Sequence, residues 1–262
     1  MHALGRSAEN GRSARVERSS YAVYYGKLYS SMRAGDLGAM LTNEDLDATL
    51  TQYVFLASEK ERAVLEAGLG RVAPEDTARF LQNVFCSPHA FLENISRVQF
   101  AKGISDIVSV ETDMFSTVIC SGLPFAVKES LLESVYKFFS TYLCSECSGR
   151  LQSNVTNLSA EERTLYPFDT VCYMWWDFTN LGPGGTEADA ALVNQAIVSV
   201  QRRCLYLPSE ACIESGLHGL SHWMGFDPQG IADIIGELLL VRPEISPALR
   251  QYAEICRVGM AQ

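Results

Sequence analysis

Apolar side chains recur at steps of three and four residues along most of this chain, which is the spacing of one helical face. The alternation of apolar and polar positions that is typical of strands is weak. The predicted helices include residues 16–33, 125–144 and 187–205. The pattern therefore predicts an all-α protein.

The last third of the chain carries explicit helix-start signals. Ser209 precedes one predicted helix, Asp227-Pro228 a second and Ser246-Pro247 a third. A small polar side chain accepts hydrogen bonds from free amides at a helix start, and proline fits the first turn because no N–H is needed there. The short connections between these helices predict that they pack as neighbours.

Polar and small residues interrupt the helical pattern at two places. Residues 1–15 combine arginines with Ser, Gly and Asn, which predicts a flexible tail. Residues 145–158 are also polar and small, and we place a boundary there. The expected organisation is an N-terminal helical half, 16–148, and a C-terminal helical half, 149–262, with one continuous domain as the alternative.

Composition narrows the functional classes. The chain has 262 residues, 47% of them hydrophobic, and 31 acidic against 21 basic residues give a net charge of −10. This balance argues against nucleic-acid binding, because phosphate contacts need clustered Lys and Arg, and it favours a basic protein or peptide as partner. The apolar runs are shorter than the roughly 20 residues of a membrane span. Eight scattered cysteines predict buried thiols in the reducing cytoplasm.

Residues 211–220, Asp227-Pro228 and the aliphatic segment 231–240 together resemble a HEAT-type repeat of the HEAT/armadillo class. This resemblance implies antiparallel helix pairs stacked as an α-solenoid, with a compact helical array as the alternative. The Trp-Trp-Asp segment at 175–177 and the Glu-Ser-x-Leu-His-Gly-x-x-His-Trp segment at 214–223 are also similar to bacterial proteins of unassigned function. That second likeness implies no activity.

One predicted helix carries possible metal ligands. Glu214, His218 and His222 follow at four-residue steps and so share a face. Two imidazoles one turn apart can bind one zinc or iron ion, with Glu214 or Asp177 as third ligand. The alternative is that both histidines hydrogen-bond to backbone or to Asp177, while nearby glycines let another helix approach closely.

The three tryptophans fall in two short segments. Trp175, Trp176 and Trp223, together with Asp177, form a candidate partner-binding surface, because tryptophan is enriched where proteins bind. The alternative is that the rings fill gaps between helices, and that Asp177 caps a helix or accepts an indole N–H. The sequence leaves both interpretations open.

Two further motifs lack the sequence context that a functional site of their type requires. Cys144 and Cys147 form a lone C-x-x-C without the strand-to-helix setting of a redox motif or a second ligand pair for zinc, which predicts two incidental thiols. Residues 182–186 are a glycine-rich loop without the flanking pattern of a phosphate cradle. The sequence singles out neither a Ser/His/Asp set nor any other catalytic residue.

Two hypotheses follow. The first is a non-enzymatic interaction scaffold, or an inhibitor or immunity-type protein, which recognises its partner by charge complementarity and needs no cofactor. The second is a metal-dependent hydrolase or oxygenase that uses His218, His222 and a carboxylate with zinc or iron.

Overall fold

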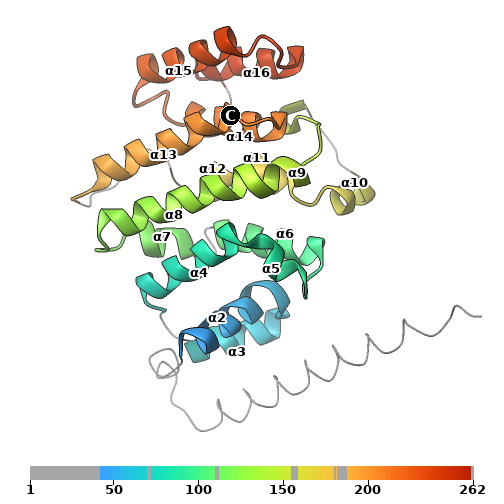
Figure 1. Ribbon diagram of the computed structural model, residues 1–262, viewed down its shortest axis with the longest axis vertical. Coiled ribbons are helices and arrows are strands. Elements are labelled where there is room, and N and C mark those ends of the chain that lie inside the picture. Colours follow the sequence, from blue (N-terminus) through green and yellow to red (C-terminus); the bar gives the residue numbers. More distant parts are fainter. Residues whose placement is uncertain are drawn as a thin grey trace, which may run out of the picture. The chain divides into compact units, whose positions relative to one another are not determined.

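The computed structural model describes residues 42–69, 72–109, 112–154, 159–179, 181 and 188–260, and all regular structure in these ranges is helical (Figure 1). The described residues divide into two compact units. The first takes in 42–49, 57–69 and 72, and the second takes in 50–56 and the described residues from 73 onward. The prediction of an all-α chain is confirmed for this part of the protein.

The first unit contains most of α2 (Asn43–Thr51) and α3 (Glu59–Leu69). Each helix follows a hydroxyl side chain that accepts from a backbone amide: Thr42 Oγ1 accepts from the amide of Asp45, and Ser58 Oγ from that of Glu61. The Glu61 carboxylate also accepts from the Ser58 amide, which completes a capping box.

The second unit is larger and carries the candidate site. Its helices are η1 (Gln52–Leu56), α4 (Pro74–Cys86), α5 (Pro88–Leu92), α6 (Arg97–Val108), α7 (Met114–Ile119), α8 (Phe125–Phe138), η2 (Phe139–Leu143), α9 (Cys144–Glu146), η3 (Gln152–Asn154), α10 (Ala160–Leu165), α11 (Asp169–Tyr173), α12 (Trp175–Phe178), α13 (Ala190–Cys204), α14 (Glu210–Ser221), α15 (Pro228–Val241) and α16 (Pro247–Arg257).

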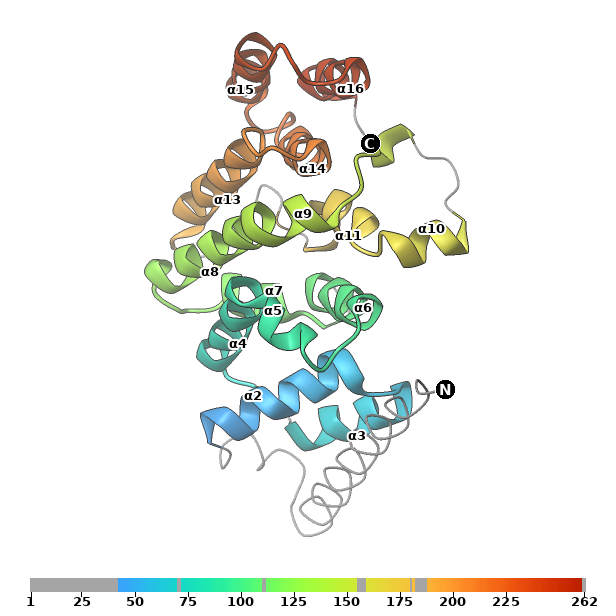
Figure 2. The ribbon, with the colours of Figure 1, turned by 45° about the vertical axis from the view of Figure 1, so that its right-hand side comes forward.

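Helices in this unit pack in a series. α4 lies against α8, α8 against α13, α13 against α14, and α14 against α16, which also packs on α15 (Figures 1 and 2). The apolar spacing that predicts the 187–205 helix matches the buried face of α13, which presents Val193, Ile197 and Val200. Helix α13 thus buries the face that its sequence spacing predicts.

Helix α14 lies at the centre of these contacts, touching α11, α12, α13, α15 and α16. Every residue from Ala211 to Ser221 is buried. This explains its composition, because a helix enclosed on all sides needs small and apolar residues around its whole circumference rather than along one stripe.

Most predicted helix starts agree with the structure. Asp227 accepts from the amide of Gly230 at the start of α15, and Ser246 accepts from that of Leu249 at the start of α16. Ser209 does stand at the N-cap of α14, but its side chain makes no capping hydrogen bond. That part of the prediction is wrong.

The segment between α9 and α10 is held by buried carboxylates in its described part. Asp169 accepts from the amide and hydroxyl of Ser148, at 2.7 and 2.5 Å. The expected boundary at residue 148 therefore lies inside the second compact unit. The expected tail at 1–15, the helix at 16–33 and the glycine-rich loop at 182–186 lie outside the described residues.

In the part of the chain that the structure describes, no helix is both long enough and apolar enough to cross a membrane.

Candidate metal centre

The site begins with a close contact between α12 and α14. A Cβ atom at Gly219 of α14 would lie 2.6 Å from Cδ1 of Trp176, which is far inside van der Waals contact. The absence of a side chain at Gly219 therefore lets the Trp176 indole pack directly against α14. Because Asp177 follows Trp176 directly on α12, this packing sets the Asp177 carboxylate in front of α14.

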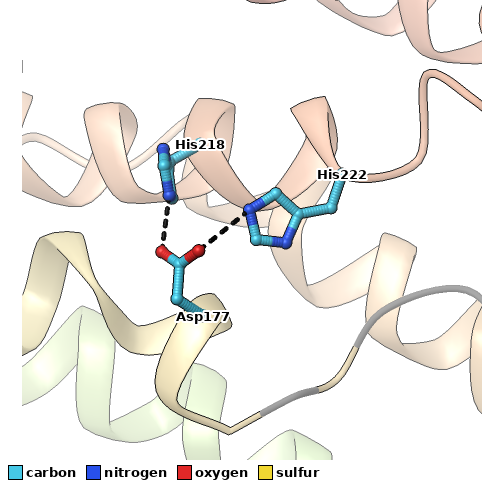
Figure 3. A group of neighbouring side chains, drawn as sticks. All are labelled: Asp177, His218 and His222. Carbon is cyan, nitrogen blue, oxygen red and sulfur yellow. Dashed lines mark hydrogen bonds and ion pairs between the residues drawn. The ribbon is translucent and has the colours of Figure 1, made fainter. Parts of the chain in front are cut away.

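Three donor side chains meet at this point, as Figure 3 shows. Nε2 of His218 lies 2.6 Å from Oδ2 of Asp177, and Nε2 of His222 lies 3.3 Å from Oδ1 of the same carboxylate. One ligand atom from each residue lies within 4.8 Å of the other two. Two donors bound to one zinc ion at a tetrahedral angle lie about 3.3 Å apart, so small side-chain movements bring this set to coordination distance.

Two tyrosines stand behind His218. The hydroxyl of Tyr252 lies 2.9 Å from His218 Nδ1, and 3.3 Å from the hydroxyl of Tyr173. Burial raises the pKa of both tyrosines, so both hydroxyls stay protonated at neutral pH. A hydroxyl can donate or accept, so Tyr252 suits either tautomer of His218, including the one that leaves Nε2 free for a metal.

The cluster is partly open to solvent. His218 is buried, with 5% of its side chain exposed, whereas Asp177 and His222 are exposed by 33% and 27%. Burial is the main cause that lowers the pKa of His222, which favours the neutral imidazole that a metal ion binds. The arrangement is a two-histidine, one-carboxylate set with one side facing water.

Glu214 lies away from this cluster, which corrects its predicted place beside the histidines. Its carboxylate accepts from the amides of Gln152 and Ser153 and from the Ser153 hydroxyl, at 2.8, 2.9 and 2.5 Å. Burial raises the pKa of this carboxyl above its ordinary value. The helix face that the spacing predicts is real, but Glu214 is occupied in holding η3, and Asp177 supplies the carboxylate of the cluster.

The tryptophans are buried, so in this structure they form no exposed contact surface. Trp175, Trp176 and Trp223 are 0, 1 and 2% exposed. Trp175 packs against four phenylalanines and Trp176 stacks on one of them; these are Phe85, Phe115, Phe138 and Phe139. Trp223 packs edge-to-face against Phe226. The three indole rings therefore fill space between helices, as the second of the two sequence-based interpretations expects.

Sequence reasoning missed both tyrosines. Tyr252 lies on α16 and Tyr173 on α11, so the fold brings them to His218 from 34 and 45 positions away along the chain. Neither stands in a pattern that marks a ligand-supporting role. Asp177, in contrast, is named in the sequence analysis as one of two possible third ligands.

Comparison of the chain with protein families, curated proteins and solved structures finds no match.

Proposed function

We propose that this protein binds one divalent transition-metal ion, zinc or iron(II), through Asp177, His218 and His222, and that its function is metal-dependent. The observation that carries the proposal is the meeting of three donors at a partly open point: Asp177 on α12, His218 on α14 and His222 at the C-cap of α14. Imidazole and carboxylate donors suit zinc and iron, and two histidines with one carboxylate are typical of sites that keep coordination positions open.

The packing around the donors supports this proposal. Trp176 and Gly219 hold α12 against α14, and Tyr252 orients the inner imidazole, as supporting groups do in metal sites. A metal held by three protein ligands lowers the pKa of a bound water to about 7 and polarises a substrate oxygen, which is the chemistry of a hydrolase. An oxygenase is the alternative for iron.

Metal analysis tests this proposal directly. The purified full chain is loaded with zinc or iron(II), dialysed and measured by elemental mass spectrometry, and we expect about one ion per chain. His218→Ala/His222→Ala and Asp177→Asn should each lose the ion. His89→Ala is the matched control, because His89 lies on α5 outside the cluster. A wild-type chain without metal, or variants that retain it, would contradict the proposal.

A second candidate function is the acidic interaction scaffold, supported by a groove of about 300 Å³ between α8 and α13. Glu129 lines it together with the apolar side chains of Phe125 and Leu192, and so does Glu133, whose carboxylate is paired with Arg203. This mixture suits a basic, amphipathic helix from a partner protein, and the groove lies where successive helices pack side by side.

The same packing supports HEAT-like stacking of helix pairs within the second unit.

Fluorescence anisotropy with a labelled basic amphipathic peptide tests the groove. We expect Glu129→Lys to weaken binding at least tenfold, about 1.4 kcal/mol, since it reverses a groove charge. Glu237→Lys makes the same charge change on α15, away from the groove, and should leave affinity nearly unchanged. Equal losses in both variants would show nonspecific charge attraction and would refute this candidate.

A further inference from the structure

Four thiols gather where the end of the α8–η2–α9 run meets α11 and α14. The sulfurs of Cys144 and Cys212 lie 3.6 Å apart although the residues are 68 positions apart in sequence. The Cys172 thiol on α11 donates to the carbonyl oxygen of Ala211 at 3.7 Å, and the neighbouring thiols of Cys147 and Cys212, together with burial, raise its pKa. The fold thus gives the lone C-x-x-C a second pair of cysteines, which the sequence alone could not place beside it.

The Cys144 and Cys212 thiols share a proton unequally. The hydrogen bond that the Cys144 thiol donates to the Cys212 sulfur is the largest cause that lowers the pKa of Cys212. The same hydrogen bond is the largest cause that raises the pKa of Cys144. The shared hydrogen bond thus favours ionisation of Cys212 over ionisation of Cys144, and the thiolate is the reactive form of cysteine.

Exposure differs within the pair. Cys212 lies in the buried core of α14, whereas Cys144 is only half-buried. Cys144 is therefore the more exposed residue of the pair, and its sulfur is in contact with that of Cys212. This is the arrangement of an attacked thiol with its resolving partner in redox-sensitive proteins.

We propose that Cys144 and Cys212 form a reversible disulfide when the protein meets a hydroperoxide. Proton transfer to Cys212 gives the Cys144 thiolate, which attacks one peroxide oxygen; the O–O bond breaks, and Cys144 becomes a sulfenic acid while hydroxide leaves. Cys212 then loses its proton to that hydroxide and attacks the Cys144 sulfur. The S–S bond forms as the S–O bond breaks, and the second hydroxide takes a proton from solvent. With hydrogen peroxide, two thiols and one peroxide give one disulfide and two waters.

The geometry allows this step with local movement. A disulfide has an S–S distance of about 2.05 Å, so the two sulfurs must close from 3.6 Å by about 1.5 Å. Cys144 lies in the last turn of the continuous α8–η2–α9 run, three residues before the run ends at Cys147, whereas Cys212 lies in the enclosed α14. The disulfide would join α9 to the helix that carries His218 and His222, and its formation needs no metal.

Disulfide mapping tests the proposal on the full wild-type chain. The reduced protein is treated with hydrogen peroxide, its remaining thiols are alkylated under denaturing conditions, and it is cut after glutamate. Cleavage after Glu146 separates Cys144 from Cys147, and cleavage after Glu210 and Glu214 separates Cys212 from Cys204. We expect peptide Ser134–Glu146 linked to peptide Ala211–Glu214, with two alkylatable thiols lost and then restored by dithiothreitol.

Variants separate this pair from its neighbours. Cys144→Ser should abolish the linked peptide, while Cys147→Ser, three residues away on the same segment, should retain it. Cys144 linked to Cys147, intermolecular disulfides alone, or sulfinic acids without any disulfide would overturn the proposal. So would thiols that stay reduced because they hold a zinc or copper(I) ion, which elemental analysis of the same sample detects.

Discussion

Gly219 shows how one residue sets the geometry of the candidate site. Its missing Cβ leaves the space that the Trp176 ring occupies, and Gly216 does the same for the backbone of α13, where a Cβ would lie 2.8 Å from the Gln201 carbonyl oxygen. Both glycines lie on α14, where close approach to neighbours outweighs the helix propensity that alanine would add. The histidine cluster depends on these contacts because Asp177 follows Trp176.

Replacing Gly219 with alanine should destabilise the protein by about 1–3 kcal/mol, because the new methyl group overlaps an indole ring in a filled core. Gly236→Ala is the matched control: it also lies in a helix, and a Cβ there meets nothing within 4 Å. We expect that change to stabilise the protein by up to about 1 kcal/mol. Urea unfolding measures both, and equal effects would contradict the close packing described for Gly219.

At the scale of elements, α8 and α13 are joined by a buried ion pair. Nζ of Lys128 lies 3.0 Å from Oδ1 of Asp189, and only 1% of the lysine side chain is exposed. Asp189 precedes α13 without capping it through its side chain, so its described role is to neutralise this ammonium group. A buried charge without its partner is costly, whereas the intact pair adds little net stability.

Asp189→Ala should therefore lower the free energy of unfolding by about 3 kcal/mol, since it leaves the Lys128 ammonium group buried without its carboxylate. Lys128→Met, which removes the buried charge itself, should cost less. The half-exposed pair of Arg202 and Glu237 provides a control, and Glu237→Ala should change stability by less than about 1 kcal/mol. Equal losses for Asp189→Ala and Glu237→Ala in thermal or urea unfolding would contradict this account.

For the whole molecule, the sequence predicts helices well because their signals are local. The apolar spacing of α13 and the caps formed by Asp227 and Ser246 each depend on a few neighbouring residues. The polar segment near residue 148 is harder to interpret. It resembles a linker locally, but Asp169 and Glu214 hold it from 21 to 62 residues away.

The candidate site divides in the same way. The four-residue spacing of His218 and His222 predicts their shared face, because a single helix carries both. The choice between Glu214 and Asp177 as third donor depends on tertiary packing, and so do the approach of Tyr252 and the pairing of Cys144 with Cys212. No local pattern encodes these contacts. The sequence therefore identifies Asp177, His218 and His222 as candidates, but it does not show which side chains lie together in the folded protein.

The enclosure of α14 by neighbouring helices has a consequence for ligand capture. His218 loses its rotational freedom when the protein folds, since the surrounding side chains and the Tyr252 hydroxyl already fix its ring. The entropy cost of ordering this side chain therefore belongs to the free energy of folding, and it does not reduce the affinity for a metal ion that binds afterwards. Capture would then require rearrangement chiefly from the outer donors, His222 and Asp177.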